Sequence, residues 1–299
     1  MFRLAHLSDI HLGPLPPVAR RELMSKRITG YVNWQRNRGR HYLPETTANL
    51  VADLLQRKPD HIAVTGDLIN LGLDAEMRTA RDWLAALGAP HDVSVVCGNH
   101  DAYVPGALGA ALAAWQPWVA GDDGHVVRDV KDYPVLRRRD GISLIGCNSA
   151  RASLPLYATG YFYQPQADAL AELLEAEGRA GRCRVVLIHH PPVARATAFH
   201  KRLIGASRFR EAVARHGAEL VLHGHTHLAT IHTIPGPNGP VPVVGVPSAG
   251  EPGGKRKPAA RYNLFTIAKG PKGWSIAMQE YGAATGSAEI GLIAKRQLA

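Results

Sequence analysis

One pattern, repeated five times, constrains the fold of this chain more than any other feature. Each time, a short apolar run ends in residues drawn from Asp, Asn and His. The runs occupy 2–7, 62–65, 93–96, 185–188 and 219–222, and the residues behind them are Asp9, His11, Asp67, Asn99, His100, His189, His225 and His227. Buried strands of α/β proteins place functional side chains at their carboxyl ends. Chance explains one or two such ends, whereas five indicate a site along one sheet edge.

Helical patterns separate many of these strands. Pro44 is expected to open a helix through Lys58, and Asp74 to cap a helix through Leu87. Further helices are expected at 107–119, at 164–178, and up to His216 behind a Ser207 cap. This alternation of strands and helices predicts the α/β class, with βαβ units and a functional site at the strand ends.

The remaining segments predict strands and turns. Asp140-Gly141, between runs at 135–139 and 142–145, indicates a hairpin. Four more strands are expected at 231–234, 241–246, 262–268 and 274–281, followed by a loosely held polar tail after Gly282. No linker or internal repeat divides the chain. We therefore predict a single domain over 1–299, with two packed sheets flanked by helices.

An insertion at about 14–43 departs from this order. Between Arg20 and Arg40 there are seven basic residues against the single acid Glu22, which is +6 of the net charge of +10. The spacing of residues 24, 28, 31, 32 and 35 predicts a broken amphipathic helix, with Tyr31, Trp34 and Tyr42 interleaved. Two interpretations stay open: a packed structural insertion, or a lid at the site rim that gathers anionic substrates or touches an anionic membrane.

Composition narrows the classes of protein. Hydrophobic residues make up 45% and charged residues 20%, as in globular proteins with a sizeable core. No apolar run reaches the ~18 residues that span a bilayer, and the N-terminus lacks a secretory apolar region. Three cysteines form no disulfide framework and are expected to be buried apolar residues, so we expect a cytoplasmic protein, peripheral at most to the inner membrane face. No segment suggests a stable nucleic-acid complex.

The chemistry of the strand ends points to metal. Imidazole, carboxylate and amide donors without thiolate suit Mn, Fe or Zn. Gly224 allows a tight turn, and in extended backbone His225 and His227 would leave the same side, as would Asp9 and His11. Adjacent residues in an extended segment face opposite ways, so His190 is expected to be structural or to support a ligand, and His223 to be a hydrogen-bonded core residue. Asp101 is expected to orient the loop that carries Asn99 and His100.

The ordered set of motifs resembles the calcineurin-like metallophosphoesterases, and most of all their class III cyclic-nucleotide phosphodiesterase branch. The motifs are Asp9-x-His11, Gly66-Asp67, Gly98-Asn99-His100-Asp101, His189 and Gly224-His225-x-His227. The resemblance implies a four-layer α/β/β/α sandwich of two mixed sheets with two divalent or mixed-valence ions. One ion would take Asp9, His11 and His227, and the other Asn99, His189 and His225. Asp67 would bridge them.

The implied activity is hydrolysis of small phosphodiesters, including 3′,5′-cyclic nucleotides, by a metal-bridging hydroxide. His100 would bind no metal and would protonate the leaving alkoxide as the catalytic acid. Two alternatives are kept. The basic, aromatic insertion favours a hydrolase of a larger amphiphilic phosphoester at the membrane surface, such as a phospholipid or a nucleotide–lipid pyrophosphate. A non-enzymatic scaffold would be expected to have lost ligands, and this chain has the full set. The sequence does not predict the oligomeric state.

Overall fold

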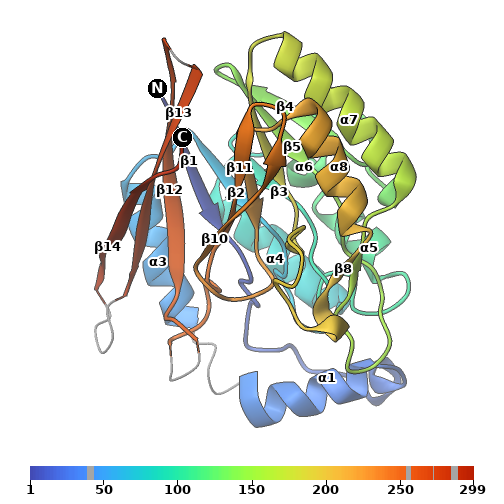
Figure 1. Cartoon of the computed structure of the whole chain (residues 1–299). Coiled ribbons are helices and arrows are strands. Elements are labelled where there is room, and N and C mark those ends of the chain that lie inside the picture. The colour runs from blue at the N-terminus through green and yellow to red at the C-terminus, as the bar shows by residue number, and fades with distance from the viewer. Residues whose placement is uncertain (39–43, 254–256, 272, 284–288) are drawn as a thin grey trace.

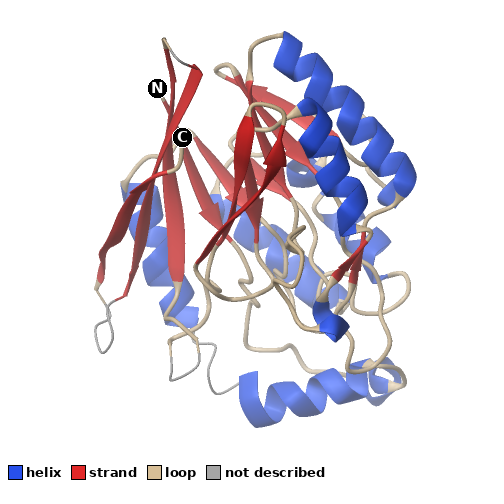
Figure 2. Cartoon of the chain, in the orientation of Figure 1, coloured by secondary structure: helices blue, strands red, loops and turns tan. Residues whose placement is uncertain are grey.

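Two six-stranded mixed sheets form the centre of the molecule, and helices cover their outer faces (Figures 1 and 2). The computed structural model describes residues 1–38, 44–253, 257–271, 273–283 and 289–299. Residues 39–43 of the predicted basic insertion, Arg40 and Tyr42 among them, lie outside the described residues.

The first sheet has the strand order β14-β13-β12-β1-β2-β3. Its parallel strands are β1 (Phe2–Leu7), β2 (His61–Val64) and β3 (Val93–Val95). An antiparallel extension continues from β1 through β12 (Arg261–Gly270), β13 (Gly273–Ala283) and β14 (Ile290–Gln297). The parallel strands come from the N-terminal third of the chain, so three of the predicted strand ends share one edge.

The second sheet has the order β10-β11-β9-β7-β5-β4. Its parallel strands are β5 (Ile142–Gly146), β7 (Cys183–Leu187), β9 (Leu220–His223) and β11 (Gly239–Gly245), between antiparallel edge strands β4 (Val135–Arg139) and β10 (Thr230–Gly236). A small pair, β6 (Gly160–Tyr161) and β8 (Leu203–Ile204), was not expected from the sequence. Asp140 and Gly141 have φ of 49° and 82°, which confirms the predicted hairpin.

Three hydrophobic clusters hold four layers together. One lies between the sheets, from Leu4 and Phe265 to Leu187 and Leu222. A second joins the first sheet to α3 (Pro44–Gln56), α4 (Asp74–Leu87), α5 (Ala107–Ala114) and α6 (Gln116–Val119). The third joins the second sheet to α7 (Gln164–Arg179) and α8 (Ala206–His216). The predicted four-layer α/β/β/α sandwich is thus confirmed, and all three cysteines are buried and free.

Several predicted helix boundaries are wrong for identifiable reasons. Asp74 begins α4 rather than capping it, because Glu76 Oε2 accepts the Leu73 amide at 3.1 Å. Ser207 lies inside α8, behind Gly205 in the left-handed region with φ of 82°. The helix expected at 107–119 breaks at Trp115, whose buried indole donates to Met77 O at 3.0 Å.

The tail after Gly282 was expected to be loosely held, and this is also wrong. Residues Ile290–Gln297 form β14, which pairs with β13 as the edge strand of the first sheet. The sequence of β14, Ile-Gly-Leu-Ile-Ala-Lys-Arg-Gln, does not alternate apolar and polar residues, so its strand signal is weak.

The basic insertion forms three short helical pieces at the bottom of Figure 1, apart from the helical layers. They are η1 (Arg20–Leu23), α1 (Arg27–Asn33) and η2 (Trp34–Arg38), the last with π-helical bonding. The predicted broken helix is therefore confirmed. Within the described residues, no helix combines the length and apolarity that crossing a bilayer requires.

Candidate metal centre

The carboxyl ends of β1, β2 and β3 in one sheet meet those of β7 and β9 in the other. The contact is close: the His225 amide donates to Asp9 Oδ2 at 2.9 Å, although the two residues are 216 positions apart. Gly224 makes this approach possible, because a Cβ there would collide with Ser8 Oγ. The structure thus brings together all eight residues predicted at the strand ends, seven of them buried and His100 half-buried.

Asp67 lies at the middle of this group. Its Oδ2 is 3.5 Å from His189 Nε2 and 3.9 Å from His11 Nε2, while Oδ1 accepts the His100 amide at 2.7 Å. Two nitrogen or oxygen ligands on one ion, each with a bond of about 2.1 Å, lie roughly 3–4 Å apart. One carboxylate oxygen with an imidazole nitrogen on each side therefore has the spacing expected of a ligand shared by two ions.

The first predicted ligand set is Asp9, His11 and His227, whose candidate donor atoms all lie within 4.8 Å of one another. His227 Nε2 is 3.0 Å from Asp9 Oδ1. His11 Nδ1 donates to Ile69 O at 3.2 Å, since a carbonyl oxygen can only accept, and this fixes its Nε2 as the ligand nitrogen. His227 Nδ1 lies 2.9 Å from Lys257 Nζ. Lys257 belongs to a Gly- and Pro-rich segment whose sequence does not indicate a residue of the metal centre.

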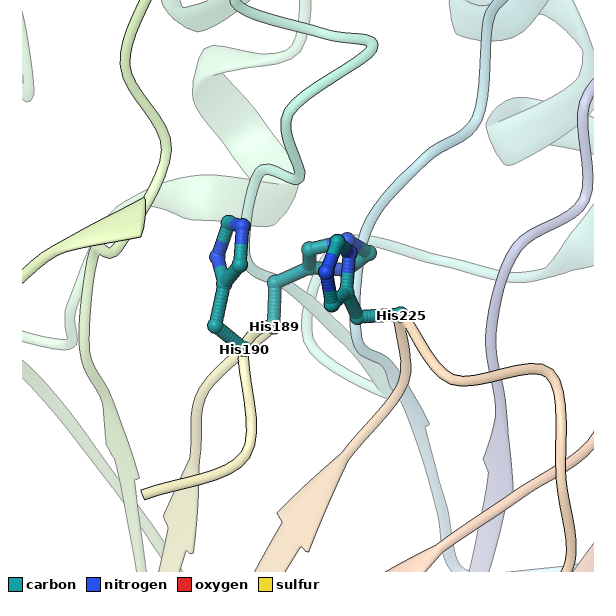
Figure 3. A group of neighbouring side chains, drawn as sticks. All are labelled: His189, His190 and His225. Carbon is teal, nitrogen blue, oxygen red and sulfur yellow. The ribbon is translucent and has the colours of Figure 1, made fainter. Parts of the chain in front are cut away.

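The second predicted set is Asn99, His189 and His225. His189 Nδ1 donates to Thr65 O at 2.6 Å, and its Nε2 lies 3.3 Å from Asn99 Oδ1. His225 Nε2 donates to Lys201 O at 2.9 Å, which leaves Nδ1 as its ligand nitrogen. The rings of His189 and His225 lie together at the strand ends (Figure 3), with centroids 5.2 Å apart. The assignment of both sets to metal stays a prediction.

His190 also lies in this group, with its ring centroid 4.3 Å from that of His225 (Figure 3). It does not face away from the site, but its contacts agree with the structural, ligand-supporting role that was expected. Both ring nitrogens have protein partners: Nε2 donates to Ala158 O at 3.2 Å, and Nδ1 accepts from Ser149 Oγ at 2.8 Å. Burial and the neighbouring His225 hold the pKa of His190 well below its usual range. No nitrogen lone pair remains for an ion, so His190 supports the His225 ring by packing.

The buried carboxylates and imidazoles of this site shift one another's pKa values. Burial alone would lower the pKa of His189, but the Asp67 and Asp9 carboxylates outweigh it and raise that pKa to about 9. Burial likewise opposes ionisation of Asp67, yet His189 and His100 hold its pKa well below the usual value. Burial and His189 lower the pKa of His225 to about 3. Two buried carboxylates require compensating positive charge. A protonated His189 supplies part of it in the metal-free protein, and divalent cations would supply it in the loaded one.

The backbone at these residues is unusual. Nine described residues other than glycine have positive φ, and five belong to the predicted ligand sets: Asp9, His11, Asp67, His225 and His227, with φ between 49° and 67°. The interpretation that Asp9 and His11, and likewise His225 and His227, lie in extended backbone is therefore wrong. Each left-handed residue costs about 1–2 kcal/mol and persists only where surrounding structure enforces it. Such strain clusters at functional sites.

Asp101 provides much of that enforcement. Its carboxylate accepts the amides of Gly98 at 2.7 Å, Asp67 at 2.9 Å, Leu68 at 3.0 Å and Ile69 at 3.3 Å. The predicted orienting role is confirmed and extends to the loop behind β2. A Cβ at Gly98 would collide with Asp67 Oδ1, so the two loops can meet only there.

His100 lies beside the ligand sets. Its Nδ1 donates to Asn70 O at 2.6 Å, its ring stacks on Tyr103 with centroids 5.4 Å apart, and it meets His11 edge-on at 4.8 Å. The sequence reasoning missed both Asn70 and Tyr103, since neither follows a strand directly. With Nδ1 bonded to a carbonyl, Nε2 is the nitrogen that can exchange a proton with a substrate. His223 is buried, with Nδ1 bonded to Gly224 O at 2.9 Å, which confirms the core interpretation.

Comparison with known proteins is consistent with this geometry. The family model described as calcineurin-like phosphoesterase matches residues 2–229. A probable cyclic nucleotide phosphodiesterase from Synechococcus sp. is 28% identical over 240 residues, covering 76% of this chain and 74% of that protein. Among solved structures, a dimetal phosphatase from Danio rerio aligns with a TM-score of 0.63 at 14% identity, over 99% of this chain and 98% of that one. A purple acid phosphatase from yellow lupin aligns with a TM-score of 0.56 at 10% identity, over 99% of this chain and 53% of that one.

Proposed function

The chain belongs to the calcineurin-like phosphoesterase family, and from this premise we propose that it is a two-metal phosphodiesterase acting on small phosphodiesters, 3′,5′-cyclic nucleotides among them. Metal-dependent hydrolysis of phosphoesters is the activity that the family and the donor set share. The diester preference is the finer proposal. Its support is the Synechococcus relative, described as a probable cyclic nucleotide phosphodiesterase.

The observation that carries the proposal is the position of Asp67 Oδ2, 3.5 Å from His189 Nε2 and 3.9 Å from His11 Nε2. On one side, Asp9 and His227 complete a set with His11; on the other, Asn99 and His225 complete a set with His189. The donors are nitrogen and oxygen, without thiolate, and suit Mn, Fe or Zn. The chemistry that two bound divalent cations supply is activation of a water nucleophile and neutralisation of negative charge on the phosphoryl oxygens.

The chain's own residues divide the remaining work. Asn99 is a neutral donor, so the site keeps a net positive charge toward a phosphate once cations are bound. The hydrogen bond from Nδ1 to Asn70 O and the stack on Tyr103 fix the orientation of the His100 ring. His100 Nε2 would then hold the proton that the leaving alkoxide needs. Such general-acid assistance is worth about 10²–10⁴-fold in rate.

A panel of substrates tests the proposal. The purified chain, loaded with Mn²⁺ and separately stripped with a chelator, is assayed on bis-p-nitrophenyl phosphate, cyclic AMP, p-nitrophenyl phosphate and a nucleotide–lipid pyrophosphate. We expect metal-dependent turnover of both diesters with kcat/KM above that of the monoester. A preference for the monoester or the lipid pyrophosphate would contradict the diester proposal and leave the hydrolase class standing. The absence of turnover on the whole panel would contradict the class as well.

A further inference from the structure

Exposed apolar side chains collect at one end of the molecule. The stripe Met24, Ile28 and Val32 recurs every fourth residue along the basic insertion, and these side chains are 85%, 54% and 40% exposed. Leu154 and Leu156, in the loop before β6, are 73% and 85% exposed. Phe199, at the start of the 3-10 helix η4 (Phe199–Lys201), is 66% exposed. We call these six residues the apolar rim. An amphipathic helix that packs on its own protein buries its apolar stripe, and here that stripe faces outward.

Hydrogen bonds tie the three segments of the apolar rim together. Lys26 Nζ donates to Ser153 Oγ at 3.0 Å and to Tyr157 O at 3.1 Å, which joins the basic insertion to the loop before β6. The Ala158 amide donates to His200 O at 2.9 Å, which joins that loop to η4. The rim is therefore one surface, although its residues come from segments far apart in the sequence.

This surface adjoins the candidate metal centre. Lys201 O, two residues after Phe199, accepts the hydrogen bond from His225 Nε2. Lys26 Nζ lies 4.6 Å from the centre of the Tyr103 ring, which stacks on His100. In Figure 1, α1 runs along the end toward which the parallel strands of both sheets point, and the two termini lie at the other end.

The charged residues around the rim are predominantly basic. Segments 20–38, 151–157 and 193–202 contain a single acidic residue, Glu22. Their exposed cations include Arg20, Arg21, Arg36, Lys201 and Arg202, and the Arg202 guanidinium lies 3.8 Å from the centre of the Phe199 ring. Apolar side chains surrounded by basic ones match a bilayer with anionic headgroups, each cation near the surface adding about 1 kcal/mol of attraction. A second copy of this chain would bring like charges together.

We propose that the apolar rim seats this protein on the surface of an anionic lipid bilayer. Met24, Ile28, Val32, Leu154, Leu156 and Phe199 enter the interface between headgroups and acyl chains, and the surrounding cations contact the anionic headgroups. The metal centre then lies beside the membrane surface. This inference goes beyond the proposed function and does not depend on which phosphoester is the substrate.

Vesicle sedimentation without substrate tests it. The whole chain is mixed with vesicles of phosphatidylcholine alone or of phosphatidylcholine with phosphatidylglycerol, at low and high salt. We expect partition at least about tenfold stronger into the anionic vesicles, weakened by salt. The triple variant Met24→Ser/Ile28→Ser/Val32→Ser should lose at least about tenfold of that partition, because it removes three of the six apolar side chains that enter the interface.

A matched control separates the rim from apolarity in general. Leu292 and Ile293 on β14 are 46% and 38% exposed and lie outside the rim, so Leu292→Ser/Ile293→Ser should leave partition unchanged. Turnover of bis-p-nitrophenyl phosphate and the thermal midpoint show whether each variant is folded. Equal partition of the triple variant and wild type would overturn the proposal, as would equal loss in the β14 control. A dimer in wild type that the triple variant abolishes, without vesicle binding, would assign the surface to self-association instead.

Discussion

The candidate metal centre and the apolar rim are neighbours built on opposite principles. In the metal centre, buried side chains are held by backbone amides and carbonyls, and five predicted ligands have left-handed backbone. In the rim, side chains from three separate segments stand exposed, and the segments are joined by a few hydrogen bonds such as those of Lys26. Chemistry that requires fixed geometry is supported redundantly, whereas a surface that has only to meet lipid can be held by few bonds.

The largest loss of turnover is expected from a substitution at Asp67, which belongs to both predicted ligand sets. Asp67→Ala removes the carboxylate predicted to be shared by both ligand sets, so we expect at least ~10³-fold lower turnover and loss of most bound metal. Activity assays and elemental analysis measure this. The control Asp53→Ala removes a carboxylate of α3 that pairs with Arg57. Retention of both metals in Asp67→Ala would contradict the bridging assignment.

The next prediction separates metal binding from proton transfer. His100→Ala should keep the metals and lose about 10²–10⁴-fold in turnover of cyclic AMP, because no group remains to protonate a poor leaving group. The loss should be much smaller for bis-p-nitrophenyl phosphate, whose leaving group hardly needs a proton. If both substrates lose equally, His100 positions the phosphate and is not the acid.

A smaller effect is expected at the support of the metal centre. In Asp101→Asn one carboxylate oxygen becomes an NH₂ group that faces two backbone amides and cannot accept from them. Leaving two buried donors unsatisfied costs about 2–4 kcal/mol in the free energy of unfolding. Urea denaturation measures this, and metal titration should show weaker affinity. Unchanged stability would mean that the loops behind β2 and β3 hold their shape without this carboxylate.

The smallest effect is expected in the attachment of the rim. Arg27 donates to the carbonyls of Leu71 and Gly72, which lie in the loop between β2 and α4. Arg27→Met keeps the apolar stem and removes these bonds, at about 1 kcal/mol each. Hydrogen exchange in residues 20–38 should accelerate, while turnover of bis-p-nitrophenyl phosphate stays within about threefold. Arg36→Met, an exposed arginine of the same insertion, is the control. A collapse of turnover would show that the rim and the metal centre act as one unit.

Much of the fold was predictable because its signals are local. Buried parallel strands appear as apolar runs, and the residues that end them are Asp, Asn and His in all five cases. The positive φ values of Asp9 and His225 were not predictable, since contacts between the two sheets enforce them. The proximity of His190 to His225 was equally hidden, because it depends on Ser149 and Ala158 from another segment. The strand β14 was missed because its apolar residues are consecutive and do not alternate with polar ones.

The distance of 216 positions between Asp9 and His225 has a consequence for how the protein matures. During synthesis the ligands of the first sheet leave the ribosome long before those of β7 and β9, and N-terminal segments fold earlier. An ion that met the nascent chain at that stage would find four of the seven predicted ligands. With both predicted sets as metal ligands, tight metal loading would wait until the second sheet has docked, and release of metal during unfolding would report separation of the two sheets.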